Sequence, residues 1–137
     1  MALLSANMAV CETVLWEKKS DVPTLVRAMT ALNLGSGNNL ARFFVVTGVY
    51  SQPGDYLQHT LRVTATDQAG NSIAHAAPYN FAYGYELDPN GPGGFILTTS
   101  FDLDVSQLRL PLHCLISAFL DNEPRPVAST PLMLRRV

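Results

Sequence analysis

Histidines, cysteines and carboxylates are the side chains of this chain that could carry acid, base or metal chemistry. The sequence has three histidines and two cysteines, and no motif fixes one histidine beside another. Several aspartates share a position at a predicted turn or strand end: Asp55, Asp67, Asp88, Asp102, Asp104 and Asp121. Aspartates at one pole of a β-protein can bind calcium, but Asp88-Pro89-Asn90-Gly91 begins like a calcium loop and then places prolines where ligands should be. We therefore interpret the aspartates as turn formers.

No known motif completes a catalytic or cofactor site. The sequence lacks a phosphate-cradling glycine loop, a nucleophile elbow and a histidine pair at zinc spacing. Cys11 and Cys114 have no partnering histidine cluster, so they predict two buried thiols rather than a zinc site or a disulfide. We predict no catalytic residue, no metal and no cofactor. The enzymatic alternative is a weak hydrolase in which Glu12, His59 or the loop aspartates converge on a cleft.

An alternating aromatic row is the feature that most suggests binding. Tyr79, Phe81, Tyr83 and Tyr85 recur at every second residue, which places four rings on one face of a strand. The rings could pack over a neighbouring sheet with the hydroxyls at its rim, because large aromatics are mostly buried. They could instead form an exposed platform for a sugar ring, a peptide or a partner protein. These four residues are the candidate binding site.

Length, charge and hydropathy limit the class of protein. A chain of 137 residues predicts one domain, residues 1–137, and 47% hydrophobic against 15% charged residues argues against a disordered segment. A formal charge of −2 gives no electrostatic case for nucleic acid or an anionic membrane. No window reaches the ~18 apolar residues of a membrane span. Ser5, Asn7 and Glu12 interrupt an N-terminus without early Lys or Arg, so we expect a cytoplasmic protein rather than a secreted one.

The clearest structural pattern is Leu108–Leu134, which predicts two strands joined by a tight turn. Apolar residues recur at every second position of the first strand: Leu110, Leu112, Cys114, Ile116, Ala118 and Leu120. Asp121-Asn122-Glu123-Pro124 supplies the turn. Leu115 and Phe119 lie on the opposite face, which predicts a strand covered at least partly on both sides.

The same alternation predicts strands at Leu3–Trp16, Leu57–Thr66 and Phe95–Leu103. A continuous apolar run predicts a strand at Arg42–Tyr50, and the turn after Thr66 predicts a returning strand at Ser72–Ala76. Leu3–Trp16 has a predicted inner face of Leu4, Ala6, Met8, Val10, Val14 and Trp16. Arg42–Tyr50 is apolar on both faces and predicts a central strand. Leu57 and His59 share an inner face with the rest of their strand, so we interpret His59 as a satisfied inner histidine.

One segment, Leu25–Leu34, fits two periods. Its apolar residues match a helical spacing, with Pro23 in a first helical turn and Gly35 at a helix end. They also alternate as in a strand, and the surrounding chain is extended. We predict a strand, with a short helix as the alternative.

The predicted fold is all-β. About eight strands with regular turn signals, and no alternation of strands with long helices, predict a single antiparallel β-sandwich. We expect it to be immunoglobulin-like or C2-like, with at most one short helix.

Short motifs along most of the chain carry a resemblance to a known group. They are Cys11-Glu12, Val14-Leu15, Glu17-Lys18, Leu25-Val26-Arg27, His59-Thr60-Leu61, Asp67 to Gly70, Leu120-Asp121-Asn122 and Pro131-Leu132. In these the chain resembles a family of small uncharacterised bacterial β-sandwich domains of unknown function. The resemblance favours a strand at Leu25–Leu34 and implies no catalytic residue, cofactor or substrate.

We expect a non-enzymatic binding or assembly module of a bacterial cytosolic protein. Its apolar, weakly charged composition and its aromatic row favour a protein partner or self-association through a sheet face or an edge strand. The alternative is a small-ligand or carbohydrate-binding domain, of which the weak hydrolase is a variant.

Overall fold

The computed structural model describes residues 3–16, 23–84 and 90–137. These residues form ten strands and no helix, and so no helix long and apolar enough to cross a membrane. The strands are β1 Leu3–Trp16, β2 Pro23–Ala28, β3 Ala31–Leu34, β4 Leu40–Ser51, β5 His59–Thr66, β6 Ser72–His75, β7 Tyr79–Phe81, β8 Gly93–Asp104, β9 Leu112–Leu120 and β10 Ala128–Arg136. The all-β prediction is confirmed, whereas the expected number of about eight strands is too low.

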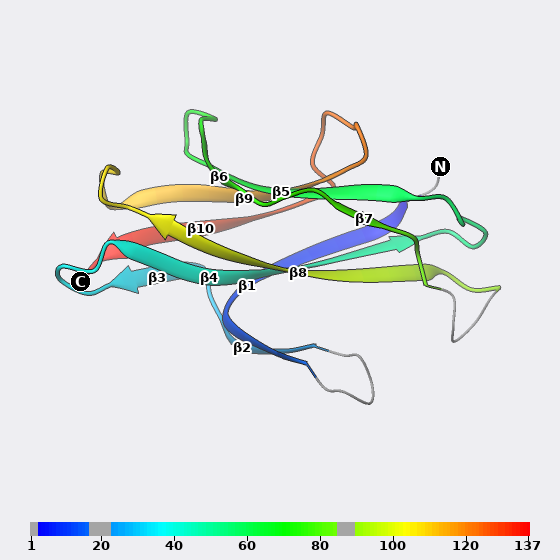
Figure 1. The fold of residues 1–137 in the computed structure, drawn as a ribbon, viewed down its shortest axis with the longest axis horizontal. Helices are drawn as coiled ribbons and strands as arrows, with labels where there is room; N and C mark the ends of the chain where they lie inside the picture. The colour runs from blue at the N-terminus through cyan, green and yellow to red at the C-terminus, as the bar shows by residue number, and fades with distance from the viewer. Residues whose placement is uncertain (1–2, 17–22, 85–89) are drawn as a thin grey trace.

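The strands form two sheets that lie as two layers (Figure 1). One sheet has four strands in the order β2-β1-β4-β8. The other has six, in the order β3-β10-β9-β5-β6, with β7 also beside β5. Neighbouring strands are antiparallel except β3 and β10, which run parallel. The prediction of a wholly antiparallel sandwich is therefore wrong at this one pair.

The core lies between the two sheets and combines inner faces that the alternation predicts with residues of β4, whose sequence is apolar on both faces. Phe43 and Val45 from β4 meet Leu61, Ile116 and Leu132 from the six-stranded sheet in one buried cluster. Each of these side chains is at most 1% exposed, which is the close packing that a two-layer β-protein needs. The central position predicted for Arg42–Tyr50 is confirmed, because β4 pairs with β1 on one side and β8 on the other.

Two predicted core positions are wrong because they lie where a strand begins. Leu4, near the start of β1, is 47% exposed. Leu57 is 67% exposed because β5 begins only at His59. Alternation identifies the face of a strand, but it does not show how far along the strand a second sheet covers that face.

Leu25–Leu34 is extended, as predicted, but it forms two strands in different sheets. β2 pairs with β1, and after Ala28 the chain crosses over and β3 pairs with β10. Backbone bonds hold the crossing, since the Met29 amide donates to Val10 and the Met133 amide donates to Thr30. Arg27, at a φ of 55°, supplies the bend just before it. The helical alternative is wrong because both halves of the segment complete sheet ladders.

Phe43→Ala tests the two-sheet core. The Phe43 ring is 1% exposed and stacks on Phe101 at a centroid distance of 5.3 Å. Its removal should lower the free energy of unfolding by about 3–5 kcal/mol, measured by urea denaturation. Leu115→Ala on the outer face of β9, where the side chain is 44% exposed, is the control and should cost about 0.5 kcal/mol or less. Equal losses in the two variants would contradict this placement of the core.

Candidate functional site

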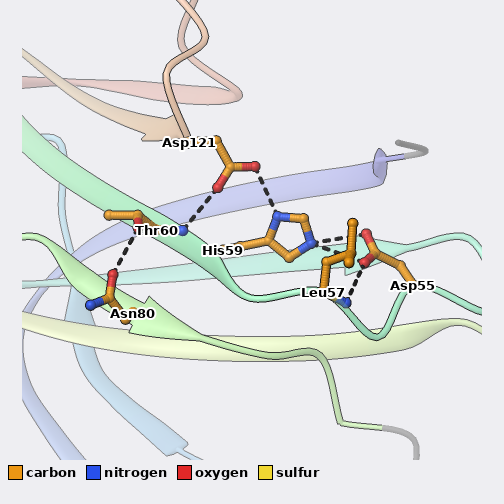
Figure 2. Close-up of polar contacts among 6 residues, drawn as sticks. All are labelled: Asp55, Leu57, His59, Thr60, Asn80 and Asp121. Atoms are coloured by element: carbon orange, nitrogen blue, oxygen red, sulfur yellow. Dashed lines mark hydrogen bonds and ion pairs between the residues drawn. The ribbon is translucent and has the colours of Figure 1, made fainter.

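His59 lies between two carboxylates (Figure 2). Its Nδ1 is 2.8 Å from Oδ2 of Asp121, and its Nε2 is 3.0 Å from both carboxylate oxygens of Asp55. The three side chains come from the loop between β4 and β5, the first residue of β5, and the position directly after β9. The histidine therefore joins two loops at one end of the sandwich.

Backbone hydrogen bonds hold both carboxylates in place. Asp55 accepts a bond from the Leu57 amide at 3.1 Å. Asp121 accepts a bond from the Thr60 amide at 2.9 Å, and its own amide donates to the Thr60 carbonyl at 2.7 Å. Asp121 has a φ of 54°, a left-handed conformation that aspartate tolerates better than most residues. Asp121, which the sequence predicts as a turn residue, therefore also holds the His59 side chain.

The imidazole ring is buried against aromatic neighbours. His59 is 4% exposed. Its ring centroid lies 5.2 Å from that of Tyr83 and 5.7 Å from that of Phe81. A buried polar ring needs hydrogen-bond partners, and the two aspartates supply them. The prediction of a satisfied inner histidine is confirmed.

Both carboxylates favour the protonated histidine. Burial lowers the pKa of His59, but the hydrogen bonds and charges of Asp121 and Asp55 outweigh it and hold the pKa above its usual value. Burial raises the pKa of Asp55, but hydrogen bonds from His59 and the Leu57 amide, with the His59 charge, hold it below its usual value. The two carboxylates therefore favour the imidazolium form of the ring, which can donate from both nitrogens.

This geometry suits a structural clamp better than an acid–base catalyst. Each ring nitrogen already faces a carboxylate, so neither is directed toward a substrate atom. The Thr60 hydroxyl, the nearest candidate nucleophile on β5, donates instead to Asn80 Oδ1 at 2.7 Å. Glu12 lies apart from the cluster and pairs with Arg27 at 3.1 Å. The predicted convergence therefore includes His59 and two aspartates but not Glu12.

The other aspartates cap turns or pair at the surface. Asp67 accepts bonds from the Ala69 and Asn71 amides, and Asp104 accepts one from the Ser106 amide. Asp102 pairs with Arg42 at 3.2 Å. Asp88 lies outside the described residues, and within residues 3–16, 23–84 and 90–137 no three ligand-type side chains could hold a metal ion. Turn formation is confirmed for Asp67 and Asp121.

The two cysteines are free and buried, as predicted. Burial raises the pKa of the Cys114 thiol to about 11, with a further contribution from the Asp67 charge. Burial also raises the pKa of the Cys11 thiol. Both thiols are therefore kept protonated and weakly nucleophilic at neutral pH.

The aromatic row is divided between core and surface. Phe81 and Tyr83 are 4% and 6% exposed, and the Phe81 ring stacks on Phe95 at 4.4 Å. The Tyr79 ring also stacks on Phe95, at a centroid distance of 5.6 Å, and Tyr79 is 49% exposed. Tyr85 lies outside the described residues. Tyr79 is therefore the described member of the row that can meet a ligand, and a binding role for the row stays a prediction.

A groove of about 410 Å³ is a second candidate site, and residues of all four strands of the four-stranded sheet line it: Asn7, Met8, Ala9, Pro23, Leu25, Val46, Gly48, Tyr50 and Ile96. Gly48 gives the groove its floor. A Cβ there would lie 2.8 Å from Asn7 Oδ1 and 2.9 Å from the Tyr50 hydroxyl oxygen, so the missing side chain lets both polar groups lie over the backbone. The groove is mostly apolar with two polar groups inside it.

The free edge of β8 is a third candidate site. Among the described strands only β4 runs beside β8, apart from a single bridge in which Gly84 and Gly94 exchange both backbone bonds. From Gly93 to Phe101 the strand has no charged residue and no proline. Its pairing with β4 runs through twelve residues without a bulge. Within residues 3–16, 23–84 and 90–137, β8 therefore has a long, regular row of backbone groups with no neighbouring strand beyond the bridge at Gly94.

Comparisons with known proteins show the fold and no more. No family model and no curated protein matches the sequence. The chain is similar to a bacterial adhesin from Mobiluncus mulieris that contains intramolecular disulfide, isopeptide and ester bond cross-links, with a TM-score of 0.57 and 9% identity, covering 97% of this chain and 58% of that one. It is also similar to a β-glucuronidase from glycoside hydrolase family 2, with a TM-score of 0.50 and 20% identity, covering 72% of this chain and 10% of that one.

This chain thus spans less than two thirds of either protein. Identities this low support a shared two-sheet fold but no shared activity. The resemblance to bacterial domains of unknown function stays a prediction.

His59→Gln tests the clamp through the pH dependence of stability. Because folding raises the pKa of His59, its interactions with the two carboxylates stabilise the folded state fully at any pH below the pKa of histidine in the unfolded chain. This stabilisation is lost as pH rises through the pKa of His59 in the folded state. The lowered pKa of Asp55 gives stability that is lost only as pH falls through the folded pKa of that carboxyl. The variant should therefore lose about 2 kcal/mol of unfolding free energy near pH 5.5 and much less near pH 10.

Urea denaturation at both pH values measures the difference. His75→Gln, at an exposed histidine of β6, is the matched control and should leave stability unchanged at either pH. A loss for His59→Gln that does not vary with pH would show that packing, not the ion pairs, holds the ring.

Proposed function

We propose that this chain is a non-enzymatic binding or assembly module that accepts an extended strand of a protein partner at the free edge of β8. In this mode a peptide adds a strand to a sheet, and backbone hydrogen bonds supply the affinity. The observation that carries the proposal is the contrast between β8 and the other edges of the two sheets.

The other edges have the features that prevent strand addition. β2 has six residues, with Pro23 at its start and Arg27 near its end. β3 and β6 have four residues each, and β7 has three. Short strands, prolines and charges are the usual protection of a sheet edge. β8 is twice as long as β2, with twelve residues, and has none of these features before Asp102.

The surface beside this edge offers apolar area to an added strand. Ile96 is 36% exposed on the outer face of β8. The half-buried Tyr50 lies next to it on β4 and lines the same groove. Side chains of an added strand that point to this face would bury apolar surface there, which would contribute affinity beyond the backbone bonds.

We also propose that the two-sheet fold is immunoglobulin-like rather than C2-like, which the likeness to the adhesin supports. A bacterial origin and a cytoplasmic location stay predictions. The proposal of a non-enzymatic role draws support from His59, whose two nitrogens are both held by carboxylates.

Ile96→Lys tests strand addition at the edge. The probe is a fluorescein-labelled peptide with the sequence of residues 95–104, which supplies an extended strand of matching length. Fluorescence anisotropy should show saturable binding to the unmodified chain and at least tenfold weaker binding to the variant, because an edge lysine opposes pairing. Gln68→Lys, in the turn after β5, adds the same charge at an exposed position and should bind the peptide normally. The titration uses a protein concentration low enough for the chain to be monomeric. Equal binding by all three proteins, or by none, under that condition would contradict the proposal.

A small-ligand or carbohydrate site in the groove is the second candidate. Its volume of about 410 Å³ lies within the range of small-molecule sites. The Tyr50 ring and the Asn7 amide could orient a mostly apolar ligand or a sugar ring. A hydrolase at this position would need a base, and the described residues that line the groove include no carboxylate and no histidine.

Ala9→Phe tests the groove, because the new ring would fill it from β1. The probe is 1-anilinonaphthalene-8-sulfonate, an amphipathic dye that fluoresces in apolar sites. The unmodified chain should bind the dye saturably, and the variant should lose at least tenfold in affinity. Ala69→Phe, in the exposed turn after β5, adds the same ring elsewhere and is the control. Unchanged binding by Ala9→Phe would contradict a groove site.

A further inference from the structure

We infer that the strand accepted by β8 belongs to a second copy of this chain, paired antiparallel about a two-fold axis at Ser100. The inference rests on the proposed function, because it requires β8 to accept a strand, and it specifies the partner and the register. The two four-stranded sheets would then join edge to edge into one continuous sheet.

The bridge at Gly84 shows which backbone groups of β8 are available. Gly94 donates its amide to Gly84 and accepts a bond from the Gly84 amide, so both of its groups point away from β4. In a regular strand every second residue points its backbone groups to the same side. The β4–β8 register has no shift from Gly93 to Asp104. The outward row is therefore Ile96, Thr98, Ser100, Asp102 and Asp104.

The backbone groups of the odd-numbered residues of β8 point toward β4 and pair with it. The Val105 amide donates to Asn39, the residue before β4. This bond places the odd-numbered residues on the β4 side, as the alternation requires. An added strand therefore meets only the outward row, and the core-facing side chains of β8 stay in place when it binds.

Two boundaries determine the register. Gly84 occupies the edge at Gly94, so an added strand can begin pairing at Ile96. The strand ends at Asp104. The midpoint of this free segment is Ser100. Antiparallel self-pairing about that midpoint places Ser100 opposite its own copy, which is the isologous contact of a two-fold dimer.

A register shifted toward the start of the strand is blocked. Pairing about Thr98 would place Asp102 of the second copy opposite Gly94. The amide and the carbonyl of Gly94 are both already bonded to Gly84. Pairing about Ser100 leaves that bridge intact and engages every outward residue.

The side chains on the outer face fit this register. Thr98 lies opposite Asp102 of the second copy, because both are two residues from the axis. The Thr98 hydroxyl oxygen is buried and has no hydrogen-bond partner among the described residues. Rotation of the Thr98 side chain would turn this hydroxyl toward the carboxylate of the second copy, where it would make a charge-assisted bond. The two Asp102 side chains lie on opposite sides of the axis, and each is paired with its own Arg42.

Single-cysteine cross-linking tests the register. In Ser100→Cys the two new thiols lie on directly opposed, hydrogen-bonded residues about 5.5 Å apart between Cα atoms, within the range of a disulfide. Mild oxidation should convert most of this variant to a dimer on a non-reducing gel. Thr98→Cys is the matched control, because its two copies would be offset by four residues, roughly 13 Å along the strands. It should stay monomeric on the gel, and a mixture of Thr98→Cys with Asp102→Cys should cross-link. The native Cys11 and Cys114 are buried and do not compete.

Light scattering of the unmodified chain completes the test and should give twice the chain mass. A Thr98→Cys dimer without a Ser100→Cys dimer would overturn the register at Ser100. A monomer that binds the labelled β8 peptide but does not cross-link at Ser100 would overturn self-pairing and leave strand addition intact. A monomer that neither binds the peptide nor cross-links would overturn both proposals.

Discussion

The structure depends on one constraint: two apolar sheet faces must be buried against each other while every buried backbone group finds a hydrogen-bond partner. β4 meets this constraint best, since it is paired on both sides and every residue from Val45 to Val49 is buried. The crossover between β2 and β3 meets it differently, because one segment completes a ladder in each sheet in turn. β8 meets it on one side only. Its inner face is part of the core, but beyond the bridge at Gly94 no described strand pairs with its outward backbone groups.

A buried histidine lies at the end of this core. His59 begins β5, where the ring falls inside the sandwich and an unpaired imidazole would be costly. Asp55 and Asp121 remove that cost and link two loops that are far apart in the sequence. Tyr83 and Phe81 pack against the same ring. The clamp and the aromatic row are therefore one unit, which explains why half of a row that resembles a binding platform is core.

Local patterns predict the faces of this protein well and its long-range contacts poorly. Alternation identified Leu61 and Ile116 as inner residues because side-chain period is a local property of a strand. The Asp121–His59 contact spans 62 residues, and only the pairing of β5 with β9 brings the two together. The sequence also could not predict that β8 lies at an edge, because alternation does not specify the order of strands in a sheet. The parallel β3–β10 pair was missed for the same reason.

Amide hydrogen exchange along β8, measured at two protein concentrations, tests the central claim most directly. The amides of Leu97 and Thr99 point toward β4 and should be protected at both concentrations. The amides of Thr98 and Ser100 point outward and should become protected only when the protein is concentrated enough to associate. If Thr98 and Ser100 exchange as fast as an unstructured chain at every concentration, the edge of β8 does not accept a strand of a second copy, and the account of assembly at this edge is wrong.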